Sequence, residues 1–180
     1  MKKVLSTMLS VLVVLTFVFF AIASGTDAKT SSNGVDTTSE GKTSATAEIP
    51  VYKLNETVSI ETSSGKYTVK VTGINETSQR NEFSDIQANR VILISYEYEN
   101  VSYSDDLSVS DMNMKAYDKD NNLLETYPSI EEKYGSSVGT GRKSNGVVAY
   151  ALNNENNYIE IDFYDNMFNS KADCRFALEW

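Results

Sequence analysis

The stretch Ile-Leu-Ile-Ser-Tyr-Glu-Tyr-Glu-Asn, residues 92–100, decides the fold class of this chain. Isoleucine and tyrosine occupy its even-numbered positions up to 98, while serine and glutamate occupy three of the odd-numbered ones. A period of two places alternate side chains on opposite faces of a strand, so one face is buried and the other meets water. The same alternation recurs at residues 67–72, 159–164 and 175–180. The sequence therefore predicts an all-β domain of antiparallel sheets.

Turn-forming clusters rich in Gly, Ser, Asn and Asp separate these alternating stretches at 63–65, 118–122 and 153–157. Strands are expected near 56–61, 66–75, 90–100, 109–117, 122–127, 145–152, 158–164 and 173–180. Seven or eight short strands at this spacing favour a two-sheet sandwich. Residues 129–134, which follow Pro128, are expected to form at most one or two helical turns. The longest irregular stretch, 128–144, is where a binding function is expected to lie.

The strand phase also predicts which side chains form the core. Val69, Ile94, Tyr96, Val148 and Trp180 are expected to be buried, since each falls on the apolar face of its strand. The single cysteine, Cys174, shares the inward phase of the last strand, where cysteine behaves as a small hydrophobic residue.

The amino-terminal segment predicts export. Two lysines precede an apolar run over residues 4–23, and the run ends in Ala-Ile-Ala, the small-residue pattern of a signal-peptidase site. We expect a signal peptide at 1–23, cleaved between Ala23 and Ser24. The alternative is an uncleaved anchor, since about 20 apolar residues can span a bilayer; it would be the chain's one contact with membrane. Ser24 stands where a lipoprotein carries its cysteine, so no lipid can be attached there.

Residues 24–48 separate this segment from the alternating strands. Eleven of these 25 residues are Ser or Thr, and Val35 is their one branched apolar residue. Such a composition buries too little surface to offset chain entropy, so a disordered linker is expected. The folded domain is therefore placed at 49–180.

The composition excludes several function classes. The chain carries 16 Lys+Arg against 25 Asp+Glu, a net charge of −9, which disfavours nucleic acid and anionic lipid as partners. It contains no histidine, the commonest general base and metal ligand. One cysteine permits neither an intramolecular disulfide nor a thiolate zinc cluster. No catalytic residue, cofactor or enzymatic activity is therefore predicted.

The nearest approach to a metal site is Asp118, Asp120 and Asn122, whose alternating oxygens are of the kind that bind Ca²⁺. An EF-hand counted from Asp118 would need Gly at position six and Glu at position twelve, where Leu123 and Ser129 stand. Asp and Asn are also frequent in tight turns, because they bond their own backbone. The turn interpretation is favoured, and no metal is expected to be required for folding.

Four tyrosines surround the central loops, namely Tyr103, Tyr117, Tyr127 and Tyr134. Tyrosine clusters can form binding surfaces for carbohydrate or protein. The preferred interpretation is that they are partly buried residues of the sheets.

Three stretches carry a resemblance to a known family: Asn55–Val58 with Lys66–Thr72, then Ile92–Asn100, and finally the glycine-led Gly141–Leu152. The chain resembles the bacterial immunoglobulin-like domain of unknown function found in secreted proteins and lipoproteins. Thr140 replaces the proline that usually precedes the glycine. The resemblance implies an immunoglobulin-like two-sheet antiparallel sandwich and supplies no activity, since fold alone does not define function.

Together these features predict a non-enzymatic binding or adhesion module, secreted or held at the extracellular face of the cell envelope. Its partner is expected to be a protein or an envelope component, and the domain itself a monomer. The alternative is a structural envelope or stress-related protein without a discrete ligand.

The cleavage prediction is tested on secreted material. We expect the mature amino terminus to be Ser24, because Ala21 and Ala23 fit the peptidase pocket. Amino-terminal sequencing of the protein from culture supernatant measures this directly. Recovery of residues 1–23 with the protein in the membrane fraction would contradict it.

Overall fold

The computed structural model describes residues 48–180, which form eight strands and one short 3₁₀ helix. The signal-peptide prediction at 1–23, including the Ala23–Ser24 cleavage site, and all but the last residue of the predicted linker lie outside the described residues. The elements are β1 (Val51–Tyr52), β2 (Thr57–Thr62), β3 (Gly65–Thr77), β4 (Arg90–Asn100), η1 (Asp111–Asn113), β5 (Met114–Asp118), β6 (Arg142–Leu152), β7 (Tyr158–Phe163) and β8 (Cys174–Glu179).

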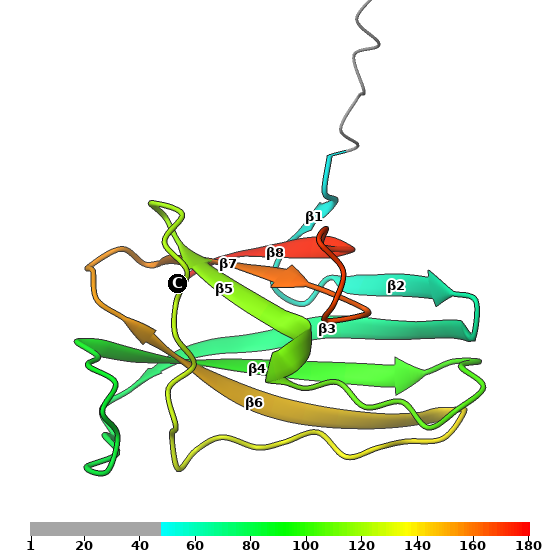
Figure 1. Cartoon of the computed structure of the whole chain (residues 1–180), viewed down its shortest axis with the longest axis horizontal. Helices are drawn as coiled ribbons and strands as arrows, with labels where there is room; N and C mark the ends of the chain where they lie inside the picture. The colour runs from blue at the N-terminus through cyan, green and yellow to red at the C-terminus, as the bar shows by residue number, and fades with distance from the viewer. Residues whose placement is uncertain (1–47) are drawn as a thin grey trace, which may run out of the picture. The chain divides into compact units, whose positions relative to one another are not determined.

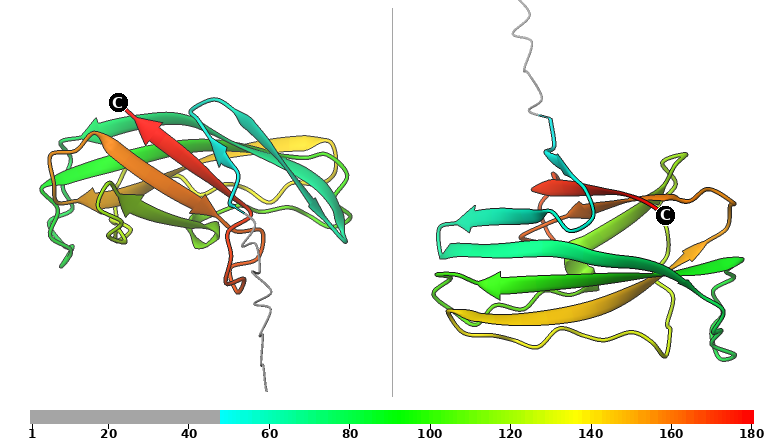
Figure 2. Two further views of the ribbon diagram at one scale, coloured as in Figure 1. Left: turned by 90° about the horizontal axis from the view of Figure 1, so that it is seen from above. Right: turned by 180° about the vertical axis from the view of Figure 1, so that it is seen from behind.

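The strands form two sheets of four, in the orders β1-β8-β7-β5 and β2-β3-β4-β6, which we name sheet A and sheet B. All neighbouring strands are antiparallel except β1, which pairs with β8 in parallel over two residues. Figure 1 shows the two sheets as separate layers, and Figure 2 shows the same layers from above and from behind. The predicted all-β two-sheet sandwich is confirmed.

The ladder of β3, β4 and β6 supplies the largest part of the fold. The stretch that decided the fold class pairs with β3 on one side and with β6 on the other. A bulge between Val71 and Gly73 shifts the register of β3, so that Ile74 rather than Gly73 faces Ile94 across the strands. The extra residue directs Ile74 toward the core, on the same side as Val69 and Val71 before the bulge.

The core lies between the two sheets, and the strand phase predicts most of it. Val69, Ile94, Tyr96 and Val148 are buried, as expected, and so is Cys174. Desolvation in the core raises the pKa of the Cys174 thiol to about 12. This cysteine is therefore a protonated core residue at neutral pH.

Trp180 is only half-buried, so its predicted full burial is wrong. It follows the last residue of β8 at the end of the sandwich, where its ring packs against the core and under the Arg90 guanidinium, 5.5 Å from the ring centroid. Arg90 also binds Glu76 at 2.7 Å and the Asn157 side chain at 2.9 Å. This cluster joins β3 and β4 of sheet B to the β6–β7 turn and to the end of sheet A.

The predicted strand at 122–127 is wrong, because this segment crosses from one sheet to the other. Leu124 N donates to Ala116 O of β5, whereas Tyr127 N donates to Ala149 O of β6. Pro128 has no N–H to donate, so the pairing of this connection with β6 stops there. It resumes where Lys133 pairs with Val147. Figure 1 shows the connection running beside β6, where it covers the edge of sheet B.

Two further boundaries differ from expectation. The strand predicted at 109–117 begins at Met114, because Ser110 caps the 3₁₀ helix Asp111–Asn113 in a reciprocal capping box with Asn113. The helical turns predicted at 129–134 reduce to one turn, closed by Glu132 N to Ser129 O, before Lys133 becomes extended.

Replacement of Ile94 by Ala tests the central ladder. We expect it to lower the free energy of unfolding by about 2–5 kcal/mol, because it leaves a cavity between the sheets. Ser95→Ala, on the opposite face of the same strand, serves as the control and should stay within about 0.5 kcal/mol of wild type. Urea titration measures both; equal effects of the two substitutions would contradict the strand phase.

Candidate functional site

The turn that follows β5 brings together the three residues considered for Ca²⁺. Asp118 is 7% exposed, and its Oδ1 accepts from the N–H groups of Asp120 at 2.9 Å and Asn122 at 2.8 Å. Its Oδ2 accepts from the side-chain amides of Asn122 and Asn154, both at 3.0 Å. Asn121 supplies the left-handed residue of the turn, with φ 63°. A cation at these oxygens would have to displace the N–H donors, and independence from Ca²⁺ stays a prediction.

These contacts also set the charge state of Asp118. Burial by itself would raise the pKa of the Asp118 carboxyl. Hydrogen bonds from the Asn122 side chain, from the N–H groups of Asn122 and Asp120, and from the Asn154 side chain outweigh burial and hold the pKa below its usual value. The carboxylate is therefore ionised at neutral pH and organises the turn.

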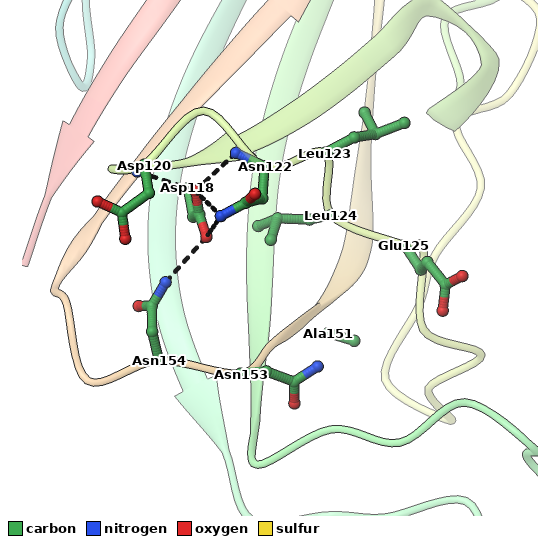
Figure 3. Close-up of a pocket in the computed structure, with 9 residues that line it drawn as sticks. All are labelled: Asp118, Asp120, Asn122, Leu123, Leu124, Glu125, Ala151, Asn153 and Asn154. Atoms are coloured by element: carbon green, nitrogen blue, oxygen red, sulfur yellow. Dashed lines mark hydrogen bonds between the residues drawn. The ribbon is translucent and has the colours of Figure 1, made fainter.

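A pocket of about 450 Å³ opens beside this turn, bounded by residues 122–125, by Ala151 and by Asn153 and Asn154 (Figure 3). Its amides are already occupied, because Asn153 accepts from Asn89 N at 2.9 Å and donates to Gln87 O at 3.2 Å. Asn154 is bonded to Asp118, as Figure 3 shows. Asp118 and the amides of this pocket therefore hold the chain's own turns together.

A more distinctive surface lies on the loop between β3 and β4. Phe83 is 88% exposed on this loop, and Ile130 is 78% exposed on the connection between β5 and β6. Asn81 joins the two segments, since its side chain donates to Pro128 O at 2.8 Å and its N–H to the Tyr127 hydroxyl at 2.8 Å. We name Phe83 and Ile130 the Phe83 ridge.

The loop that carries Phe83 is held in place on both sides. Arg80 closes its base by donating to Thr77 O at 2.8 Å and to Asn89 O at 2.9 Å. Asn81 Oδ1 accepts from Phe83 N at 3.0 Å, which fixes the turn that directs the ring. Beneath it lies a small apolar cluster on the outer face of sheet B, made of Val91, Tyr127, Ala149 and Ala151, with Ile86, Ala88 and Leu93 packed against it.

The four tyrosines singled out in the sequence do not form one surface. Tyr127 is buried and Tyr103 and Tyr117 are partly buried, so the burial interpretation is confirmed for these three. It is wrong for Tyr134, which is 71% exposed on the irregular stretch 128–144. Sequence reasoning missed Phe83 and Ile130, because a single apolar residue within a polar loop has no period; isolation among polar neighbours was the one available signal.

Residues 48–180 contain neither a metal-binding cluster nor a membrane-spanning helix. No three His, Cys, Asp or Glu side chains of these residues converge as a metal site would require. No helix formed by these residues is long and apolar enough to cross a membrane.

The fold defines a class of protein, the two-sheet antiparallel β-sandwich, in agreement with the resemblance of the sequence to an immunoglobulin-like domain of unknown function. More particularly, a family model described as a domain of unknown function (DUF5067) matches residues 37–165, and the chain belongs to this family. No curated protein sequence matches the chain.

Two solved structures share the fold. The secreted protein MPT63 from Mycobacterium tuberculosis superposes with a TM-score of 0.57 at 11% identity, covering 74% of this chain and 99% of MPT63. The yjhA protein from Bacillus subtilis gives a TM-score of 0.51 at 18% identity, covering 71% of this chain and 98% of yjhA. At these identities the likeness concerns the fold.

The role of Asp118 is tested by Asp118→Ala, with Asp120→Ala as the matched control. We expect the Asp118 substitution to cost about 1–3 kcal/mol at pH 7, because two N–H groups of the turn lose a charged acceptor. The folded-state pKa is lowered, so this contribution is present above the unfolded pKa of about 3.9 and is lost as pH falls through the folded pKa. The difference between wild type and Asp118→Ala, measured by urea titration, should shrink on acidification toward pH 3.

The control sharpens this test, since no hydrogen bond or ion pair within the described residues uses the Asp120 carboxylate. Asp120→Ala should therefore remain close to wild type in stability. Equal stability of the two variants at pH 7 would contradict the assigned role of Asp118.

Proposed function

We propose that this chain is an exported, non-enzymatic binding module that attaches through the Phe83 ridge to a protein partner, either in the cell envelope or outside the cell. The observation that carries the proposal is the exposure of Phe83 and Ile130 on two loops that are bonded to each other. Large side chains of this kind anchor protein interfaces when a partner buries them.

The rigidity of the support favours a binding role over accidental exposure. Single exposed apolar residues are common on protein surfaces and need no explanation. Here, however, Arg80 and Asn81 fix the loop by hydrogen bonds to both its ends and to its neighbour. A loop ordered before binding loses less conformational entropy on association, so more of the burial energy remains for affinity.

Charge on the outer face of sheet B supports the same location. Lysines and glutamates there pair across the strands, in the pairs Lys66–Glu61 at 3.6 Å, Lys70–Glu97 at 3.4 Å and Lys143–Glu99 at 3.0 Å. Exposed pairs of this kind contribute little to stability. The lysines and glutamates of these pairs compensate one another's charge. The Phe83 ridge is therefore the more distinctive feature of the outer face of sheet B.

Export rests on different support. The signal segment predicted at 1–23, the resemblance to domains of secreted proteins and the fold shared with the secreted MPT63 all favour a place outside the cytoplasm. The absence of histidine and the single buried cysteine favour binding over catalysis.

The test compares three immobilised forms of the chain from Ser24 onward: wild type, Phe83→Ser with Ile130→Ser, and Phe168→Ser. Phe168 is the matched control, because it is 87% exposed on the β7–β8 loop. Each form is incubated with envelope extract, and captured proteins are quantified by mass spectrometry. We expect a partner retained by wild type and Phe168→Ser and reduced about 30-fold by the ridge substitutions, as loss of a 2 kcal/mol anchor implies.

Two results would refute the proposal. One is capture that the ridge substitutions leave unchanged. The other is equal loss with Phe168→Ser, which would indicate nonspecific adsorption of exposed aromatic residues.

A further inference from the structure

A second pocket lies beside the outer face of sheet A, at the end of the sandwich where β7 begins and β8 ends. Its volume is about 590 Å³, larger than the pocket of Figure 3. Tyr158 opens β7 directly opposite Glu179 of β8, and Trp180 follows Glu179. We name this cavity the Trp180 pocket.

Two turns complete the Trp180 pocket. Lys119 and Asn121 come from the turn after β5, and Asn156 comes from the turn between β6 and β7. The hydrogen bond between Asn154 and Asp118 fastens these two turns together. The pocket is therefore assembled from three separate segments whose relative positions are fixed before any ligand binds.

The polar groups of this pocket differ from those in Figure 3. The side chains of Lys119, Asn121, Asn156 and Glu179 make no hydrogen bond or ion pair with other residues in the described range 48–180. In the pocket of Figure 3, by contrast, the amides and Asp118 are already bonded, and the polar side chains without a bond among the described residues are the carboxylates of Asp120 and Glu125. The Trp180 pocket thus presents donors and acceptors that a ligand can use without breaking an internal contact.

The charges of the lining carry a small acidic excess. Glu160 accepts from the Tyr158 hydroxyl and lies 2.9 Å from Arg175, but Arg175 is shared with Asp162, 2.6 Å away. Lys119 and Glu179 contribute one positive and one negative formal charge. The carboxylates disfavour an anionic ligand and the Lys119 ammonium disfavours a cationic one, so a neutral polar ligand is favoured.

Aromatic rings supply the remaining part of the surface. Tyr158 and Trp180 both line the pocket, and Arg90 holds the Trp180 ring from the side of sheet B. Rings of this kind offer a flat apolar surface with a polar edge. A ligand that fits therefore combines an apolar face with several groups that donate and accept hydrogen bonds.

We propose that the Trp180 pocket binds a neutral carbohydrate. The C–H face of a sugar ring packs against Tyr158 and Trp180, and its hydroxyls exchange hydrogen bonds with Asn121, Asn156 and Lys119. Side-chain amides suit hydroxyl groups, because each amide both donates and accepts. The pocket volume also lies in the range of about 300–1,000 Å³ that small ligands occupy.

This site shares no residue with the Phe83 ridge, so the two proposals stand or fall separately. The chain also provides its own reporter, because Trp180 is the one tryptophan in the sequence. Its indole N–H gives a single tryptophan side-chain peak in a ¹⁵N–¹H NMR spectrum, and that peak monitors this pocket alone.

The experiment titrates the ¹⁵N-labelled chain from Ser24 onward with cellotetraose and with tetra-N-acetylchitotetraose. We expect a saturable shift of the indole peak for at least one of them, with a Kd on the order of 1 mM, as a shallow pocket gives. Spermidine and a tetragalacturonate are titrated in parallel as cationic and anionic ligands.

Variants then locate the site. Lys119→Ala combined with Asn156→Ala should weaken binding at least about tenfold, which corresponds to 1.4 kcal/mol. This double variant keeps the Trp180 reporter, and neither substitution removes a side-chain bond found among the described residues. Asn75→Ala is the matched control, an exposed asparagine on β3 of sheet B, and should leave the Kd unchanged. Absence of an indole shift with both neutral saccharides, or a shift with the charged ligands only, would overturn the proposal.

Discussion

Three buried tyrosines of the central ladder bond the core to the loops, and the arrangement of the rest of the domain depends on them. Tyr67 donates to Asp165 at 2.8 Å, Tyr96 to Val109 O at 3.0 Å and Tyr98 to Ser136 O at 2.6 Å. Each ring lies between the sheets, while its hydroxyl reaches a segment outside the ladder. With one cysteine in the chain, no intramolecular disulfide can share this role. The rings can therefore be buried only when the loops are in place to accept hydrogen bonds from their hydroxyls.

The same tyrosines dictate where glycine is required. A Cβ on Gly146 would lie 2.3 Å from the Tyr96 hydroxyl, and a Cβ on Gly135 would lie 2.5 Å from that of Tyr98. Neither glycine has a positive φ, so close packing and not backbone conformation explains them. The β5–β6 connection can lie along β6 because these two positions leave room for the rings.

The pocket of Figure 3, the Phe83 ridge and the Trp180 pocket differ in how far their polar groups are already hydrogen-bonded within the protein. In the pocket of Figure 3 the amides and Asp118 are bonded to each other, which makes it part of the framework. At the Phe83 ridge an ordered loop exposes an apolar ring. In the Trp180 pocket the side chains of Lys119, Asn121, Asn156 and Glu179 lie beside two aromatic rings and make no hydrogen bond or ion pair among the described residues, whereas Asn157 and Glu160 are bonded. A pocket's capacity to bind thus depends on unused groups more than on its volume.

The sequence by itself determined the fold class, the inward phase of β3, β4, β6 and β7, and the burial of Ile94 and Cys174, because alternation along a strand is a local property. Only the tertiary structure decided that 122–127 crosses between sheets, that Trp180 caps the end of the core, and that the loop carrying Phe83 is bonded to the connection carrying Ile130. These depend on contacts between segments far apart in the chain, such as Asn81 with Pro128 and Arg90 with Trp180. No local pattern encodes such contacts, since periodicity specifies which face of a strand is buried but not what packs against it.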